Sequence, residues 1–228
     1  MKKLVLCLAL WLCALPLMAD VINIGTPPDP GSGNCFPFGC AYNAEYQQVY
    51  GSSDFNTGPI LIGAIEFYNT QYDSGATQTP AGTYTISLST TQYGVNNITG
   101  NFNQNKGPDN TQVFSGSINQ AWQFGNMLHI GFSTPFAYDP SKGNLLLDVV
   151  GQGITLPGGS IFYDVNSTGG YFSRVYCPGG VDCQGDGTVQ VGYGLVTCLP
   201  FNVPEPGTLV MLGTGLVGVV GAIRRRIL

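Results

Sequence analysis

His129 is the one histidine of the chain, so it limits the acid–base chemistry that the sequence can support. A Ser-His-Asp site would need Ser133 together with Asp148 or Asp164 beside this imidazole. No sequence feature marks any of them as a partner, and the chain has neither a Gly-x-Ser-x-Gly elbow nor a His-Glu-x-x-His motif. His129 lies in an apolar–polar alternation, which indicates a surface or packing role. We therefore predict no catalytic residue and a protein that is not an enzyme.

Two patterns of carboxylates suggest chemistry but fall short of a motif. Glu45 and Glu66 could form the acid–base pair of a glycoside hydrolase, yet the many acidic residues make such a pair easy to find by chance. The segment 182–187 resembles the start of an EF-hand loop, with oxygens from Asp182 and Asp186, but position twelve is Tyr193 instead of glutamate. We interpret the two glutamates as solvated acids and the segment 182–187 as a turn tied by a disulfide. A calcium site in this loop that does not follow the EF-hand pattern stays open as an alternative. We predict no cofactor and no bound metal.

Aromatic side chains offer a third chemistry, the stacking of rings on the apolar faces of sugars. Trp122 is the only tryptophan after Trp11. It could form a sugar platform with a set of tyrosines, namely Tyr42, Tyr46, Tyr50, Tyr72 and Tyr93. Most aromatic residues of a β-rich domain belong to its core, however, so the ligand-binding residues stay unknown at this stage.

Five cysteines follow the N-terminal apolar segment: Cys35, Cys40, Cys177, Cys183 and Cys198. The first two bracket a proline-containing loop, and the next two bracket a Pro-Gly-Gly turn, so each pair could close locally. A Cys183–Cys198 bridge competes with the second pair, because connectivity cannot be deduced from sequence, and one thiol is left over. A metal–thiolate site is disfavoured because no histidine lies near these cysteines.

Alternating apolar and polar residues predict the strands that position these side chains. In 83–89 the apolar residues share one face and the hydroxyls occupy the other. Segments 128–132, 145–149, 161–165 and 189–195 alternate in the same way, and further strands are expected at 45–50, 60–68, 111–117 and 170–176. The turn-forming sequence at 139–144 predicts a hairpin, because proline and glycine supply the backbone angles of a tight turn.

About nine strands, no convincing amphipathic helix and no fixed-period repeat favour one antiparallel β-sandwich or jelly-roll-like domain at 20–202. The chain has 33 glycines and 15 prolines, which fits many turns. With 43% hydrophobic and 9% charged residues it does not have the composition of a disordered protein.

Residues 1–19 have the features of a secretory signal peptide. Lys2 and Lys3 precede an apolar stretch, Pro16 breaks it, and Ala19 is a small residue suited to cleavage before residue 20. The partners implied are an export translocase and a signal peptidase.

Residues 203–228 hold the most specific pattern of the chain. Pro204, Glu205 and Pro206 are followed by an apolar run at 208–223, which ends at a cluster formed by Arg224, Arg225 and Arg226. The run is near the lower length limit of a transmembrane helix, and the arginines favour the cytoplasmic side. The residues that precede the triplet are then expected outside the cytoplasm.

This arrangement closely resembles the PEP-CTERM sorting signal, which is also labelled an ice-binding protein C-terminal domain. The resemblance implies that Pro204, Glu205 and Pro206 are recognised by an exosortase, a membrane protease-transpeptidase. It implies a bacterial protein that is exported, held transiently at the inner membrane by its C-terminal helix, and delivered to the cell envelope or the outside. Ice binding is not expected, because only Thr83 and Thr85 offer a threonine ladder.

Charge narrows the choice of partners. Between Asp20 and Val203 the chain has three basic and twelve acidic residues, hence a net charge of −9. Such a domain repels phosphate backbones, so no nucleic-acid partner is expected. Proteins that carry this tail are typical of bacteria that build exopolysaccharide or biofilm matrix. We predict a non-catalytic envelope or matrix protein with exopolysaccharide as a partner; a carbohydrate-binding module is the first alternative and a secreted hydrolase the second.

Overall fold

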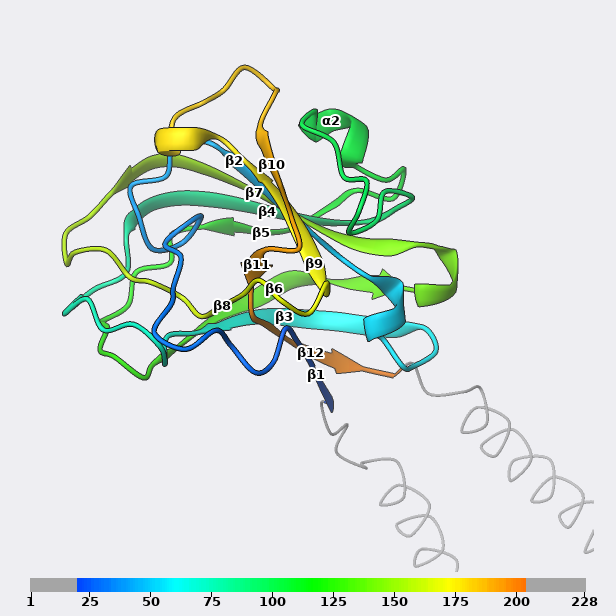
Figure 1. Cartoon of the computed structure of the whole chain (residues 1–228), viewed down its shortest axis with the longest axis horizontal. Coiled ribbons are helices and arrows are strands. Elements are labelled where there is room, and N and C mark those ends of the chain that lie inside the picture. Colours follow the sequence, from blue (N-terminus) through cyan, green and yellow to red (C-terminus); the bar gives the residue numbers. More distant parts are fainter. Residues whose placement is uncertain (1–19, 204–228) are drawn as a thin grey trace, which may run out of the picture.

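Antiparallel strands are the main regular elements in a computed structural model that describes residues 20–203 (Figure 1). The strands are β1 (Asp20–Ile24), β2 (Glu45–Tyr50), β3 (Ile60–Tyr68), β4 (Ala81–Thr91), β5 (Thr111–Gly116), β6 (Met127–Tyr138), β7 (Asn144–Thr155), β8 (Val165–Asn166), β9 (Phe172–Tyr176), β10 (Thr188–Val191), β11 (Gly194–Leu195) and β12 (Thr197–Asn202). One α-helical turn, α2 (Phe102–Asn105), and 3-10 turns at Ser52–Asp54, Pro140–Lys142 and Pro178–Gly180 join them. The predicted all-β class with antiparallel sheets is confirmed.

Two sheets lie face to face around one apolar core (Figure 1). One has the order β1-β12-β3-β6, the other the order β10-β9-β2-β7-β4-β5, and a short pair β11-β8 joins them at one side. Because side chains alternate along a strand, one face of each sheet supplies the core: Ile62, Ile65 and Phe67 from β3, for example, meet Tyr84, Ile86 and Leu88 from β4 in the same buried cluster.

Seven of the nine predicted strands are present, and the other two are corrected by the structure. In 161–165 the alternating side chains are buried as expected. The backbone hydrogen bonds, however, go to loop residues instead of a neighbouring strand: the Ile161 N–H donates to the Gly39 carbonyl, and the Tyr163 N–H donates to the Asn34 carbonyl. Segment 189–195 is broken because Gly192 adopts φ 70°, which divides it into β10 and β11. The edge strand β1 and its neighbour β12 were not predicted.

The predicted hairpin at 139–144 is wrong. The strands on either side belong to different sheets: β6 pairs with β3, whereas β7 pairs with β2 and β4. The proline and glycine form a 3-10 turn that carries the chain from one sheet to the other. Local turn chemistry is the same in both cases, so the sequence alone could not distinguish a hairpin from this crossover.

The two chain ends of the fold lie side by side. Strand β1 pairs antiparallel with β12, so that Asp20 is opposite Phe201, and Asn202 is opposite Leu61 of β3 (Figure 1). The expected signal peptide and the expected C-terminal transmembrane helix lie outside the described residues. Within residues 20–203, no helix has the length and apolar character that crossing a bilayer requires.

A buried side-chain amide ties the six-stranded sheet to the short strand β11. Gln48 of β2 is fully buried; its Oε1 accepts from the Leu195 N–H (2.8 Å) and the Tyr46 hydroxyl (2.7 Å). Its Nε2 donates to the Leu195 carbonyl (2.9 Å), and the Tyr50 hydroxyl bonds Thr197 of β12 (2.9 Å). The amide thus replaces the strand neighbour that Leu195 lacks on this side, which satisfies backbone groups that would be costly to bury unpaired.

Gln48→Leu is expected to lower the free energy of unfolding by about 1–3 kcal/mol, because it leaves the buried N–H of Leu195 without a partner and removes one of the two donors to its carbonyl, the Thr197 hydroxyl being the other. Urea unfolding of the mature protein measures this. Gln104→Leu, at an exposed position of α2, is the matched control and should change stability by less than about 0.5 kcal/mol. Equal effects of the two substitutions would contradict the role assigned to Gln48.

Candidate functional site

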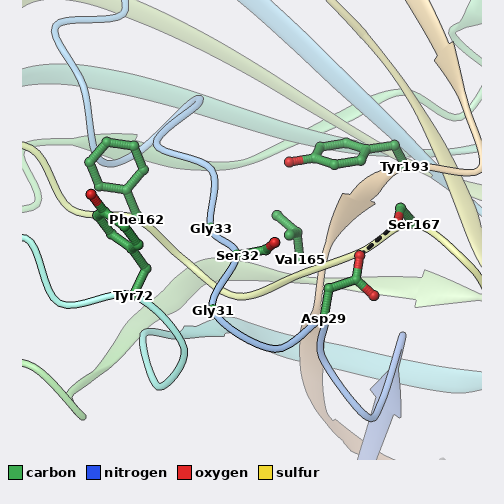
Figure 2. A pocket seen from close by; sticks show the side chains of 9 residues that line it. All are labelled: Asp29, Gly31, Ser32, Gly33, Tyr72, Phe162, Val165, Ser167 and Tyr193. Atoms are coloured by element: carbon green, nitrogen blue, oxygen red, sulfur yellow. Dashed lines mark hydrogen bonds between the residues drawn. The ribbon is translucent and has the colours of Figure 1, made fainter.

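A groove with a volume of about 440 Å³ opens between the loop after β1 and the segment around β8 (Figure 2). Its lining combines rings, hydroxyls, a carboxylate and glycine backbone: Asp29, Gly31, Ser32, Gly33, Tyr72, Phe162, Val165, Ser167 and Tyr193. Tyr72 and Phe162 lie at one end, with ring centroids 5.0 Å apart and planes at 62°. Tyr193, Asp29 and Ser167 lie at the other end, with Ser32 and Val165 between them (Figure 2).

Hydrogen bonds fix the walls of the groove. Asp29 accepts from the Ser167 hydroxyl (2.6 Å), and its N–H donates to the Val165 carbonyl (2.7 Å). Asn166 Nδ2 donates to the Pro27 carbonyl (2.8 Å), so the loop after β1 is tied to β8 at several points. Asp29 and Ser167 were not predicted as site residues, because neither belongs to a recognisable motif.

The Tyr193 wall is supported from behind by a cation. The Arg174 guanidinium lies between two rings, 4.3 Å from the centroid of Tyr193 and 4.5 Å from that of Tyr176. Burial raises the pKa of Tyr193, while the Arg174 charge acts in the opposite direction. The hydroxyl of Tyr193 therefore stays protonated at neutral pH and can donate a hydrogen bond.

The preferred interpretation, that most of the six aromatic residues belong to the core instead of a sugar platform, is confirmed for four of them. Tyr42, Tyr46 and Tyr50 are fully buried in the core, and Trp122 is buried with its indole N–H directed to Asn69 Oδ1 (3.3 Å). These rings do not form a common surface. Of the six proposed residues, Tyr72 lines the groove.

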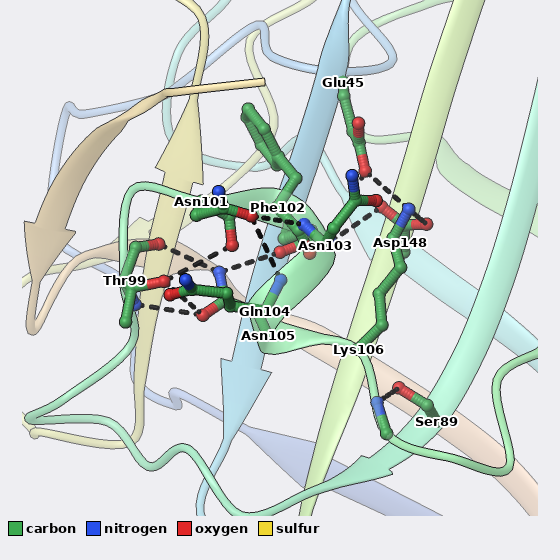
Figure 3. Close-up of polar contacts among 12 residues, drawn as sticks. Glu45, Ser89, Thr99, Asn101, Phe102, Asn103, Gln104, Asn105, Lys106 and Asp148 are labelled. Carbon is green, nitrogen blue, oxygen red and sulfur yellow. Dashed lines mark hydrogen bonds and ion pairs between the residues drawn. The ribbon is translucent and has the colours of Figure 1, made fainter.

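A polar cluster lies on the outer face of the six-stranded sheet, beneath the segment that contains α2 (Figure 3). Lys106 Nζ lies 2.9 Å from Glu45 Oε1 and 3.3 Å from Asp148 Oδ2. Gln47 donates to Asp148 Oδ1 (3.1 Å) and accepts from Asn105 Nδ2 (3.0 Å). These contacts fasten the segment to the sheet.

Asp148 is the carboxyl of this cluster with the most perturbed acidity. Burial and the neighbouring Glu45 raise its pKa to about 7, whereas Lys106 and Gln47 favour the charged form. A carboxyl that titrates near neutrality is a feature of many acid catalysts. Asp148, however, is buried under Lys106 and Gln47 and does not line the groove, so its role here is to hold the α2 segment.

His129, Glu66 and Cys198 form a row across three strands of the four-stranded sheet. Glu66 of β3 is opposite His129 of β6 and Cys198 of β12. Its Oε1 lies 2.7 Å from His129 Nδ1, and its Oε2 accepts from the Cys198 thiol (3.0 Å). The carboxylate therefore separates the thiol from the imidazole, which is not the arrangement of a cysteine–histidine nucleophile.

The chemistry of Cys198 agrees with this geometry. Burial and the Glu66 carboxylate raise the pKa of the thiol to about 12. The thiolate is the reactive form of cysteine, so this side chain is a poor nucleophile. Cys198 is the free cysteine of the described residues, and the others form local disulfides, Cys35–Cys40 and Cys177–Cys183.

The remaining predicted partners are engaged elsewhere. Ser133 donates to the Val113 carbonyl (2.9 Å), and Asp164 accepts from the N–H of Thr70 (2.7 Å), so neither contacts His129. Glu45 and Glu66 lie on different sheets and do not form a carboxylate pair. In the segment from Asp20 to Val203, no group of three or more His, Cys, Asp or Glu side chains is placed to hold a metal ion, the loop at 182–187 included.

Comparison with known families decides the nature of the C-terminal pattern. A family model described as the PEP-CTERM protein-sorting motif matches residues 202–226. The chain carries a PEP-CTERM sorting motif. The resemblance is thereby confirmed, and the motif implies an exported protein that an exosortase sorts. The triplet at 204–206 and the arginines at 224–226 fall within the match but outside the residues that the structure describes.

The solved structures that resemble the chain do so weakly. No curated protein matches the chain. A T13 particle of infectious bursal disease virus is 11% identical with a TM-score of 0.22, over 83% of this chain and 41% of the viral chain. A structure of the Gt strain of that virus is 12% identical with a TM-score of 0.22, and the match covers 94% of this chain and 54% of the viral chain. The chain thus spans about half of these viral chains, and such scores carry no argument about fold or function.

Asp148→Asn is expected to flatten the dependence of stability on pH. The folded protein keeps the Asp148 proton up to a pH of about 7, whereas the unfolded chain releases it at about pH 4. The folded state binds more protons between these values, so the free energy of unfolding falls as the pH rises, by at most about 1.4 kcal/mol per unit. Urea unfolding at several pH values measures the slope. The exposed-acid control Asp186→Asn should keep the wild-type slope; an unchanged slope in Asp148→Asn would refute the assignment.

Glu66→Gln is expected to make Cys198 more reactive. The substitution removes the negative charge that raises the pKa of the thiol, so more thiolate is present at alkaline pH. The rate of iodoacetamide labelling of the folded protein, followed by mass, should rise by up to about tenfold for each unit by which the pKa falls, since the thiolate fraction grows by that factor. His129→Asn keeps the Glu66 charge and should leave the rate near that of the wild type. Equal rates in all three proteins would show that burial alone protects the thiol.

Proposed function

We propose that the protein is a non-catalytic component of the cell envelope or extracellular matrix. The observation that carries the proposal is the junction between fold and tail. Strand β12 ends at Asn202, and the sorting motif begins at the same residue. The domain is therefore the part that sorting delivers, with one residue, Val203, between its last strand and the Pro-Glu-Pro triplet.

The steps of delivery follow from the two ends of the chain. Residues 1–19 act as a signal peptide, read by an export translocase and removed by a signal peptidase. The apolar run at 208–223 holds the precursor in the inner membrane, with the arginines at 224–226 on the cytoplasmic side. An exosortase then removes the tail and releases the domain to the envelope or the outside.

The titratable groups of the domain support a non-catalytic role. His129 and Cys198 are separated by Glu66, and Asp148 is covered by Lys106. The alternative of a secreted hydrolase is disfavoured, because Glu45 and Glu66 lie on different sheets and cannot act as a catalytic pair. A carbohydrate-binding role is favoured by the groove, and exopolysaccharide is the partner that an envelope or matrix protein would meet.

Glu205→Ala is expected to block removal of the tail, since it destroys the central residue of the triplet. Intact mass of the protein from cells that contain an exosortase measures this. The wild type should lack both ends, whereas the variant should lack the signal peptide and keep the tail in the membrane fraction. Thr208→Ser, just outside the triplet, is the control and should be processed normally. A wild-type mass that includes the tail, or normal processing of Glu205→Ala, would contradict the proposal.

A further inference from the structure

We propose that the groove lined by Tyr72, Phe162, Tyr193, Asp29 and Ser32 binds a neutral saccharide. The groove belongs to the domain alone, so its binding of a saccharide deepens the carbohydrate-binding role proposed above and does not depend on how the protein is sorted.

The lining has the two kinds of surface that a sugar ring needs. A pyranose has apolar C–H faces and a polar hydroxyl edge, so a site for it combines aromatic rings with a few placed hydrogen-bonding groups. Tyr72 is 46% exposed and rests against Phe162, which gives a ring that is available to a ligand. Val165 adds an apolar floor between this pair and the polar end.

Several polar atoms of the groove have no partner within the described chain. Asp29 uses one carboxylate oxygen for Ser167, and its Oδ1 makes no hydrogen bond there. The hydroxyls of Ser32, Tyr72 and Tyr193 are likewise without partners among residues 20–203. A carboxylate oxygen accepts from hydroxyls, and the hydroxyl groups both donate and accept. This inventory matches the hydroxyl edge of a sugar.

Charge selects against an acidic ligand. The groove has one carboxylate and no basic lining residue, and the domain carries a net charge of −9. A uronic acid or a phosphate would be repelled. A metal ion would find Asp29 alone, since no cluster of three acidic, histidine or cysteine side chains stands among residues 20–203. A neutral saccharide is compatible with this charge and uses both the rings and the hydroxyls of the lining.

The walls are held in place before any ligand arrives. Gly33 packs so closely that an added Cβ would lie 2.8 Å from the Cβ of Phe162, so the loop backbone forms part of the wall. The bridge between Asn34 and Tyr163 and the Cys35–Cys40 disulfide fix the same loop farther along. Rigid walls reduce the entropy that binding would otherwise cost.

Affinity electrophoresis of the mature protein tests the proposal. The gels contain the neutral polysaccharides laminarin, galactomannan, xyloglucan and amylopectin, or the acidic polymers alginate and polygalacturonate. We expect retardation by at least one neutral polymer, lost or reduced at least about tenfold in Tyr72→Ala and in Asp29→Asn, and no retardation by the acidic ones.

Matched controls separate the groove from general stickiness and from misfolding. Phe124 is 44% exposed but does not line the groove, so Phe124→Ala should bind like the wild type. Asp186→Asn is the matched control for Asp29→Asn and should also bind like the wild type. Urea unfolding confirms that every variant is folded. The absence of retardation by all four neutral polymers would overturn the proposal, as would equal losses in Phe124→Ala or stronger binding to an acidic polymer. Because sorting is read from the mass of the mature protein, failure here leaves the proposed delivery untouched.

Discussion

The hydrogen bonds between the Gln48 side chain and the backbone of Leu195 connect the parts of this protein that matter for function. Gln48 stands in the middle of β2, inside the core, where a polar group is tolerated because every one of its hydrogen-bonding positions is used. Gly194 is required beside it, since an added Cβ would lie 2.6 Å from Gln48 Oε1. The backbone at Gly194 must therefore lie close to the Gln48 amide for the hydrogen bonds to Leu195 to form.

This constraint reaches both candidate functional features. Two residues before Leu195 lies Tyr193, which forms one wall of the groove, and two residues after it Thr197 begins β12. Strand β12 is clamped between β1 and β3 and ends where the sorting motif starts. A single buried amide therefore positions one wall of the groove on one side and the end of the domain on the other. Domain and tail are joined almost without a linker, so the fold is presented close to the machinery that reads the tail.

Much of the fold could be predicted from the sequence because strand alternation is a local property. Segments 45–50 and 60–68 match β2 and β3 residue for residue. Which strands pair with one another could not be predicted in the same way, because the turn at 139–144 has the residues of a hairpin and yet connects two different sheets. Strand β12 was missed because Pro200 interrupts its alternation of apolar and polar residues. The sorting motif was predictable because its elements are contiguous. The groove was not, because Asp29, Tyr72, Phe162 and Tyr193 come from four separate parts of the chain and converge only after folding.

The hydrogen exchange rate of the Leu195 amide tests the central role of the Gln48 interaction most directly. Residues 192–196 form a short connection whose one regular element is the two-residue strand β11, so its amides would exchange by local opening if no such bond held them. The structure predicts that the Leu195 N–H exchanges as slowly as that of Val49 in β2, an inner strand of the six-stranded sheet, at the rate of global unfolding. Exchange of Leu195 that is fast compared with Val49 would contradict the account.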